Sequence, residues 1–243
     1  DLAWDANRWT HDNIGEYTRL WAEREFGRTH AADIADIISK YSKYNGRRKP
    51  ELLEARTYSR VTHCEWERMV EDYDAIAARA EALHAQMPPH KADAFYQLVL
   101  FPAKASALVN RLYFAAARNS LYAQQRRAST NDMARLTREL FQADAGLMTN
   151  FNKVLAGGKW DHFQDQAHIG YTTWRDPPEN TMNAIRLTEI DVPAAASLGV
   201  AVDGSALAWP GADGAPALPR FDALSRGRHY VDVFNRGATP FTF

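Results

Sequence analysis

Apolar residues recur at helical spacing from about residue 10 to residue 155, and this pattern limits the fold more than any other feature of the chain. Within each stretch they fall three or four positions apart, which places them on one face of an α-helix. The pattern predicts five helices, over residues 10–26, 29–45, 61–87, 91–125 and 131–155. Because long helices joined by short loops pack antiparallel, we expect a bundle in which each helix buries one face.

Capping and breaking residues set the expected ends of these helices. Thr10 and Thr130 precede helical runs and are expected N-caps, since a threonine hydroxyl can accept a hydrogen bond from a free helix amide. Gly27 ends the first run, and Pro88-Pro89 ends the third. Pro102 lies inside the fourth run and is expected to kink it. No strand is needed to account for the first 156 residues.

The pattern changes towards the C-terminus. Residues 186–205 pass from β-branched residues through an alanine-rich linker into short alternating runs, and residues 206–219 are rich in turn formers. Residues 229–243 alternate around an Asn-Arg-Gly turn, which predicts a strand, a hairpin turn and a second strand. The expected fold class is therefore mainly α, an antiparallel bundle of about five long helices followed by a short, incomplete β segment.

Composition excludes several classes of protein. The chain has 243 residues, 46% of them hydrophobic, which is enough for a sizeable core. A formal net charge of -1 provides no basic field for nucleic acid, and no apolar run approaches the ~20 residues that span a bilayer. Neither a nucleic acid nor a membrane is therefore an expected partner. Cys64 is the only cysteine, which excludes an internal disulfide, and without a glycine-rich phosphate loop no cofactor is expected.

The stretch 159-KWDHFQDQAHIGYTTWRDPPEN-180, called the connector below, carries the densest chemistry. Asp161, Asp165 and His168 would share one face if the stretch were helical, and two carboxylates with an imidazole suit a metal ion. Alternatively the connector caps the bundle, with His168 hydrogen-bonded and both aspartates at the surface. Since no second ligand cluster supports an ion, we expect no metal site. The same carboxylates are poorly suited to glycoside hydrolysis, because neighbours on one helix face seldom face each other across a pocket.

The aromatic residues of the connector have two interpretations. Trp160, Tyr171 and Trp174 could stack on the flat apolar faces of sugars, or they could anchor the bundle to a neighbouring domain. We expect the structural role first, with Trp160 at an interface. His168, Tyr171 and Trp174 are kept as candidates for the rim of a substrate site.

Basic residues outside the connector form two further patterns. The turn 47-RRKPE-51 groups Arg47, Arg48 and Lys49, which suits an anion or an acidic neighbouring surface but also the negative end of a helix dipole. These three residues are interface candidates. The second pattern is a polar stripe at seven-residue spacing on the fourth helix, formed by Gln97, Lys104, Arg111 and Arg118. We expect this stripe to be a solvated face, although it could bind carboxylates of a partner or of an acidic sugar. The segment 63-HCEWE-67 lacks the second histidine of a zinc-protease helix and is expected to be packing.

Several segments, taken together and in order, resemble one protein family. In the helical part they are 17-YTRLWAEREFG-27, 33-DIADIISKYSKYNGRRKPELL-53, 93-DAFYQLVLFPAKASALVNRLY-113, 121-LYAQQR-126 and 155-LAGGKWDHFQDQAHIGYTTW-174. In the C-terminal part they are 198-LGVAVDGS-205, 207-LAWPG-211, 218-LPRFD-222 and 229-HYVDVFNRG-237. They are similar to the helical region and to the start of the C-terminal β-domain of glycoside hydrolase family 115.

The resemblance implies a division of the chain and a function for its parent. Residues 1–27 would be the last loop and helix of an upstream catalytic barrel, residues 28–190 the helical bundle domain, and residues 191–243 the start of a C-terminal β-sandwich. Members of the family are xylan α-1,2-glucuronidases that remove glucuronic acid or its 4-O-methyl ether with inversion. The parent is thus expected to be a bacterial hydrolase, secreted or periplasmic, that acts on glucuronoxylan as a homodimer or other homo-oligomer.

No catalytic residue is expected in this chain, because the family's proposed catalytic carboxylates lie in N-terminal domains that precede this region. The isolated chain is therefore expected to be inactive and to act through the upstream barrel and the downstream β-domain. Two other hypotheses remain open: a nonenzymatic helical carbohydrate-binding or dimerisation module, and a helical enzyme with a carboxylate metal site.

Overall fold

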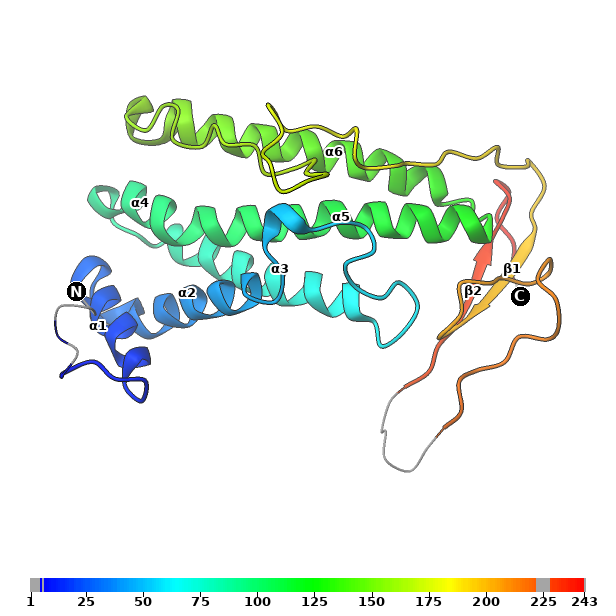
Figure 1. The fold of residues 1–243 in the computed structure, drawn as a ribbon, viewed down its shortest axis with the longest axis horizontal. Coiled ribbons are helices and arrows are strands. Elements are labelled where there is room, and N and C mark those ends of the chain that lie inside the picture. The colour runs from blue at the N-terminus through cyan, green and yellow to red at the C-terminus, as the bar shows by residue number, and fades with distance from the viewer. Residues whose placement is uncertain (1–4, 6, 222–227, 243) are drawn as a thin grey trace. The chain divides into compact units, whose positions relative to one another are not determined.

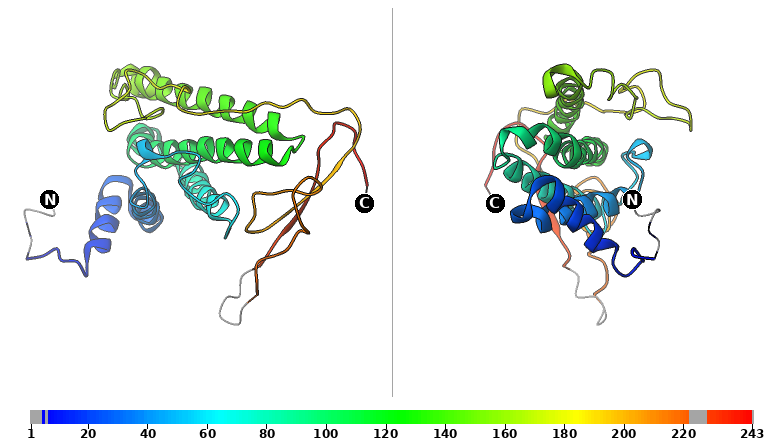
Figure 2. Two further views of the ribbon diagram at one scale, coloured as in Figure 1. Left: turned by 45° about the vertical axis from the view of Figure 1, so that its right-hand side comes forward. Right: turned by 90° about the vertical axis from the view of Figure 1, so that its left-hand side faces the viewer.

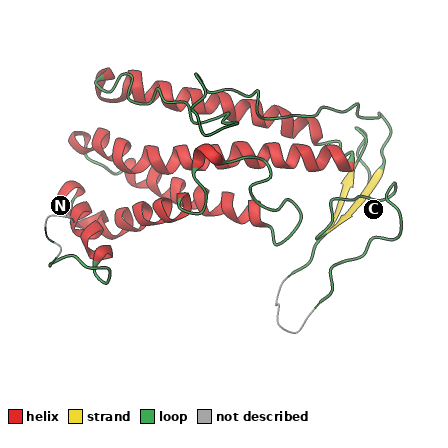
Figure 3. Cartoon of the chain, in the orientation of Figure 1, coloured by secondary structure: helices red, strands yellow, loops and turns green. Residues whose placement is uncertain are grey.

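A computed structural model of the chain describes residues 5, 7–221 and 228–242. Six α-helices are assigned in this part: α1 (Ile14–Phe26), α2 (Ala31–Asn45), α3 (Glu65–His84), α4 (Pro89–Phe95), α5 (Phe101–Gln125) and α6 (Thr130–Thr149). Two short strands follow, β1 (Leu198–Val202) and β2 (Val231–Asn235) (Figures 1 and 3). The expected fold class is confirmed, since helices dominate and the only β-sheet of the described residues has two strands.

The chain forms two compact units, each assembled from three separate stretches of sequence. The first unit consists of residues 1–52, 71–109 and 144–166, and the second of residues 53–70, 110–143 and 167–243. The division expected from the family resemblance, at residues 27 and 190, stays a prediction. Residues 1–4 and 6 of the expected barrel end, and Phe243 of the expected last strand, lie outside the described residues.

The fourth expected helix is continuous but contains a widened turn. Residues Tyr96–Leu100 form a π-helical turn, η4, that joins α4 to α5 directly before Pro102. Proline has no N–H to donate to the carbonyl four residues earlier, and its ring crowds that carbonyl. The chain widens there, and the Phe101 N–H donates to the Tyr96 carbonyl, five residues earlier. The structure thus has a π turn just ahead of Pro102, and the kink expected there stays a prediction.

Two expected N-caps are wrong. The first helix starts at Ile14, and Asn13 fixes the chain before it by accepting from the Thr10 backbone N–H at 2.7 Å. The Thr130 hydroxyl is a donor, to the Arg127 carbonyl at 2.7 Å, and not an acceptor for α6. Threonine at a helix start satisfies either a free amide or a loop carbonyl, and sequence spacing does not distinguish the two.

Other helix ends differ from expectation by a few residues. Helix α3 starts at Glu65 and not near residue 61, because His63 and Cys64 have positive φ angles of 59° and 48° that no helix contains. Helix α6 ends at Thr149, and the run expected to residue 155 is completed by a second π-helical turn, η5 (Asn150–Val154).

The core of the first unit forms where α1 and α2 pack side by side (Figures 1 and 2). Their apolar faces meet α4 and η4, and the fully buried residues of this cluster include Ala22, Ile34, Ile37, Phe95 and Val99. The rings of Phe26 and Phe95 lie edge to face with centroids 5.3 Å apart. This cluster confirms the inward face predicted for residues 29–45.

The second unit contains a two-stranded antiparallel ribbon. Val200 pairs with Val233 at its centre, and Trp209 forms an isolated bridge to Val200. The hairpin expected within residues 229–243 is wrong: β2 pairs with β1, which lies about thirty residues earlier in the chain. After Asn235 the described chain forms no strand and bonds back to the linker, with the Ala238 N–H donating to the Pro193 carbonyl at 2.8 Å.

Two asparagines fasten an extended segment to the helices of this unit. Asn119 on α5 is fully buried; its amide donates to the Thr130 and Thr188 carbonyls, and its oxygen accepts from the Thr188 N–H. Asn131 on α6 bonds Ile190 in the same two-way manner. The amide side chains thus replace a neighbouring strand, which is how residues 188–190 satisfy their backbone without a sheet.

Candidate functional site

The first half of the connector, residues 159–164, forms turns and not a helix. Asp161 pairs with Lys153 at 2.6 Å, and this hydrogen bond keeps the pKa of the Asp161 carboxyl below its usual range. Asp165 accepts from Asn152 and lies 2.7 Å from the ring of His162. The single helix face that would have joined Asp161, Asp165 and His168 does not form. No group of three potential metal ligands occurs among the residues that the structure describes.

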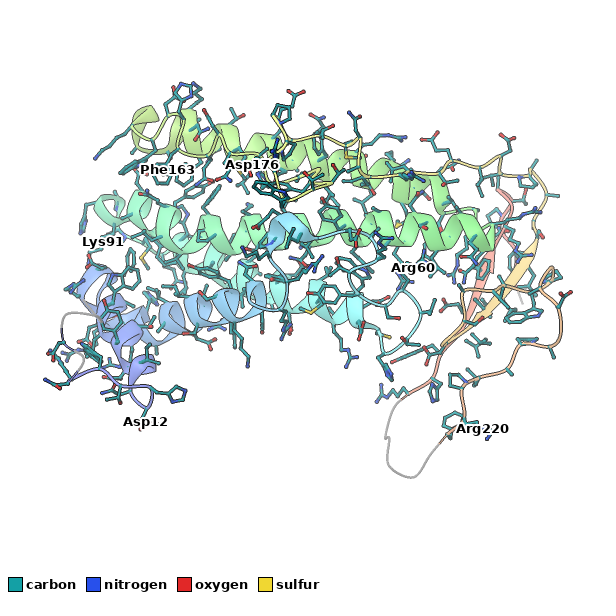
Figure 4. All side chains as sticks on the ribbon, viewed as in Figure 1. Asp12, Arg60, Lys91, Phe163, Asp176 and Arg220 are labelled. Atoms are coloured by element: carbon teal, nitrogen blue, oxygen red, sulfur yellow. The ribbon has the colours of Figure 1, made fainter. Side chains whose placement is uncertain are left out.

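Trp160 is a packing residue of the first unit. It is half-buried against the cluster of Phe101, Leu147 and Phe151, and its ring lies edge to face with Phe163 at 5.8 Å (Phe163 is labelled in Figure 4). The Lys159 ammonium lies 5.0 Å from its ring centroid. Trp160 is thus packed inside the first unit, and the interface role expected of it stays a prediction.

The second half of the connector is a loop closed at its base by Asn180. The Asn180 side-chain oxygen accepts from the backbone N–H groups of His168 and Ile169, at 2.7 and 3.0 Å. Gly170 has a φ of 98°, and a β-carbon there would lie 2.5 Å from the Thr181 methyl group, so only glycine fits. Ile169 is fully buried. The loop is therefore built and anchored, and is more than a surface linker.

The middle of this loop presents aromatic and charged groups to solvent. Trp174 is 83% exposed, and the Arg175 guanidinium lies 5.4 Å from its ring centroid. The half-buried Tyr171 bonds Asp176 through its hydroxyl at 2.9 Å (Asp176 is labelled in Figure 4). A groove of about 380 Å³ runs along the loop, lined in part by Thr173, Arg175 and Asp176. An exposed indole near polar side chains is suited to stacking on the apolar face of a sugar ring.

The basic turn is held by contacts inside the first unit. Arg47 donates to Asp72 at 3.0 Å and stacks over Tyr44, with 4.3 Å between guanidinium carbon and ring centroid. Arg48 donates to the Leu52 carbonyl at 2.9 Å, while Lys49 lies 3.9 Å from Glu51. The structure thus gives all three candidates internal partners, and their use at an interface stays a prediction.

Two residues of the polar stripe on the fourth helix form ion pairs with another helix. Lys104 pairs with Glu81 of α3 at 2.5 Å in the first unit. In the second unit Arg118 pairs with Glu67 and is only 20% exposed, so it is not the solvated residue expected. Its guanidinium also lies 5.3 Å from the Phe114 ring centroid. These pairs fix the helices to one another, a role that seven-residue spacing alone did not indicate.

A buried arginine that the sequence did not single out organises the second unit at the end of α5. Arg127 is 8% exposed; it donates to Gln125 at 2.6 Å and to Asp232 of β2 at 2.8 Å, and it stacks on Phe234 at 4.1 Å. Beside it a pocket of about 220 Å³ opens between the loop before α3, α5 and the ribbon. Two of the pocket's three arginines are matched by carboxylates, Arg118 by Glu67 and Arg127 by Asp232, and the third is Arg60.

A second pocket of the same unit, of about 550 Å³, was also missed. It is lined by residues from three distant parts of the sequence, among them Arg56, Arg60, Tyr113 and Arg186 (Arg60 is labelled in Figure 4). None of these arginines lies in a periodic pattern, and only folding brings them to one place. Sequence spacing therefore carried no signal for this pocket.

No helix of the described residues is both long and apolar enough to cross a membrane.

Comparison with known proteins gives two findings. The model of the family described as "Glycosyl hydrolase family 115" matches residues 1–52. The fold is similar to a solved GH115 4-O-methyl-α-glucuronidase with specificity for decorated arabinogalactans, at a TM-score of 0.53 and 20% sequence identity. That match covers 66% of this chain and 22% of the solved chain. The search of curated proteins found no match.

Proposed function

We propose that this chain is the helical and β-ribbon region of an α-glucuronidase of glycosyl hydrolase family 115, since that family's model matches residues 1–52 and the fold is similar to that of a solved GH115 4-O-methyl-α-glucuronidase. The parent would remove (4-O-methyl)glucuronic acid side chains from xylan with inversion, and its catalytic carboxylates would lie outside this chain. This region would link the upstream barrel to the downstream β-domain and support a homo-oligomer. In isolation it would be inactive.

A structural role for this region is best supported by the fixed partners of the connector's carboxylates. Asp161 is paired with Lys153, and Asp165 is shared between Asn152 and His162. Carboxylates held by fixed partners in this way stabilise turns and are poorly placed to exchange protons with a substrate. The residues that first suggest an active site are therefore better explained as structural.

Within that role, the loop around Trp174 is our candidate for contact with the glycan chain. A largely exposed indole on an anchored loop is unusual for a packing residue, and we take the stacking of a sugar ring on it to be worth about as much as an aromatic pair, about 0.5–1.5 kcal/mol. This corresponds to a rise in KM of roughly 2–13-fold for Trp174→Ala in the full parent enzyme. The unfolding temperature would be unchanged, because the exposed side chain packs little.

The test compares Trp174→Ala with Trp160→Ala on two polymers, 4-O-methylglucuronoxylan and a glucuronate-decorated arabinogalactan. Trp160→Ala is the packing control, for which a lower unfolding temperature and an unchanged KM are expected. The polymer for which Trp174→Ala raises KM identifies the glycan that reaches the loop. An unchanged KM on both polymers would remove Trp174 from the substrate rim.

A second function, a nonenzymatic carbohydrate-binding or dimerisation module, is favoured by the same exposed Trp174. It is distinguished by titrating xylo-oligosaccharides that bear glucuronic acid into the chain alone. Saturable binding without hydrolysis would favour the module, whereas hydrolysis by the chain alone would overturn the proposal that catalysis lies elsewhere.

A further inference from the structure

The pocket of about 550 Å³ in the second unit has the size of a small-molecule site, for which roughly 300–1,000 Å³ is typical. Three segments line it: the loop before α3 with Arg56 and Arg60, the face of α5 with Tyr113 and Ser120, and the segment that carries Arg186. Tyr113 and Ser120 lie seven residues apart, so they share one face of α5. Tyr113 is 5% exposed, which makes this wall part of the folded core.

The charge of this pocket is unbalanced. Its walls carry three guanidinium groups and one carboxylate, and that carboxylate, Glu54, is paired with Arg56 at 3.0 Å. Arg60 donates to the Ser120 hydroxyl at 2.9 Å. Within the described part of the chain, neither Arg60 nor Arg186 has a carboxylate at ion-pair distance. Two uncompensated cations thus remain in a hollow of a chain whose formal net charge is -1.

We propose that this pocket binds a small carboxylate-bearing ligand through Arg60 and Arg186. A guanidinium presents paired N–H donors that match the two oxygens of a carboxylate, and charge-assisted bonds of this type are among the stronger ones in proteins. The Ser120 hydroxyl and the neighbouring tyrosine add polar groups for hydroxyls on the rest of the ligand. The pocket's volume admits a ligand the size of one or two sugar units.

A carboxylate fits the pocket better than a phosphate group does. Phosphate sites commonly combine basic side chains with free backbone N–H groups, at a helix N-terminus or in a glycine-rich loop. No glycine lines this pocket, and its α5 residues lie inside the helix, where the amides are already bonded along the chain. The pocket's charge and size carry this assignment, which is independent of the reaction that the parent catalyses.

The experiment measures binding of four probes to the protein by calorimetry or by NMR: D-glucuronate, acetate, D-glucose and inorganic sulfate. We expect saturable binding of D-glucuronate, weaker binding of acetate, and none of D-glucose. Arg60→Gln and Arg186→Gln should each weaken D-glucuronate binding about tenfold, the effect of losing one charge-assisted bond. Raising the salt to about 1 M should weaken binding as well, because the ligand pairs with partly exposed cations.

The matched control is Arg135→Gln, an exposed α6 arginine that pairs with Asp132 away from the pocket and should leave binding unchanged. Arg186 is exposed and forms no ion pair with any residue that the structure describes, so its substitution tests the pocket even if Arg60→Gln lowers stability. Unchanged binding in both pocket variants would overturn the proposal. Equal binding of D-glucose or of sulfate would overturn the assignment to a carboxylate.

Discussion

The fastening of the extended segment by Asn119 yields the sharpest stability prediction. The Asn119 side chain is fully buried and makes three hydrogen bonds, at 2.9 Å to the Thr130 carbonyl and at 2.8 Å to each polar group of the Thr188 backbone. Each neutral bond contributes about 1 kcal/mol net, so Asn119→Ala should lower the free energy of unfolding by about 3 kcal/mol. The Thr188 backbone would lose both of its bonds to this side chain, and a cavity would remain at a fully buried position.

Asn131 provides the matched comparison. It makes the same two-way contact with Ile190, at 3.0 and 2.9 Å, but it is only half-buried. Water can replace its bonds, so Asn131→Ala should cost about 1–2 kcal/mol. Because both asparagines hold one three-residue segment, the double variant should cost less than the sum of the two single variants.

The measurements are urea unfolding, thermal unfolding and amide hydrogen exchange of the same variants. For about 3 kcal/mol, the unfolding temperature of Asn119→Ala should fall by roughly 6–12 °C in a chain of this size. Exchange at the Thr188 amide should accelerate, and exchange at Ile169, whose N–H bonds Asn180, should not. If Asn119→Ala costs less than Asn131→Ala, or if Thr188 exchange is unchanged, burial does not set the strength of these contacts and the reasoning fails.

Two further predictions concern charged residues. Arg127→Met should lower the free energy of unfolding by about 2 kcal/mol, because it leaves the buried Gln125 acceptor without its donor. As a control, substitution of an exposed arginine, Arg135→Met, should change the free energy of unfolding by less than about 0.5 kcal/mol. Equal effects of the two substitutions in urea unfolding would contradict the role given to Arg127. Burial raises the pKa of the Asp36 carboxyl, but hydrogen bonds from Lys40 and Arg79 outweigh it and the pKa is lowered overall from 3.8. A lowered folded-state pKa means that the stabilisation is present above about pH 4 and is lost as the pH falls further. The stability difference between the wild type and Asp36→Asn should therefore be constant from pH 7 to pH 5 and shrink below pH 4, and a difference independent of pH would show that the carboxylate charge does not matter.

The helices could be predicted from the sequence because each buries a periodic apolar face. Ile34 and Ile37 lie on the apolar face of the helix predicted over residues 29–45, and both are fully buried. The exact ends of the helices are harder to predict from the sequence, because they depend on single hydrogen bonds. Thr10 and Thr130 are suitable caps by type, yet Asn13 and the Arg127 carbonyl determine what each does.

Pairings between distant residues could not be predicted from local pattern. The turn formers after Asn235 indicated a hairpin, but the partner of β2 is β1, whose alternating residues were equally suitable in either arrangement. Similarly, Arg60 and Arg186 belong to one pocket although 125 positions separate them, and neither lies in a periodic run. Asp161, Asp165 and His168 do not share a helix face, because the chain forms turns at residues 159–164.

The composition of the two compact units has a consequence for how this region can evolve. The boundary between them is crossed inside α3 after Val70, inside α5 after Val109 and inside α6 after Ala143. Neither unit is therefore a continuous length of gene, and recombination between genes could not transfer one unit without cutting three hydrogen-bonded helices. We expect related proteins to gain or lose this region only as a whole, with insertions restricted to its loops.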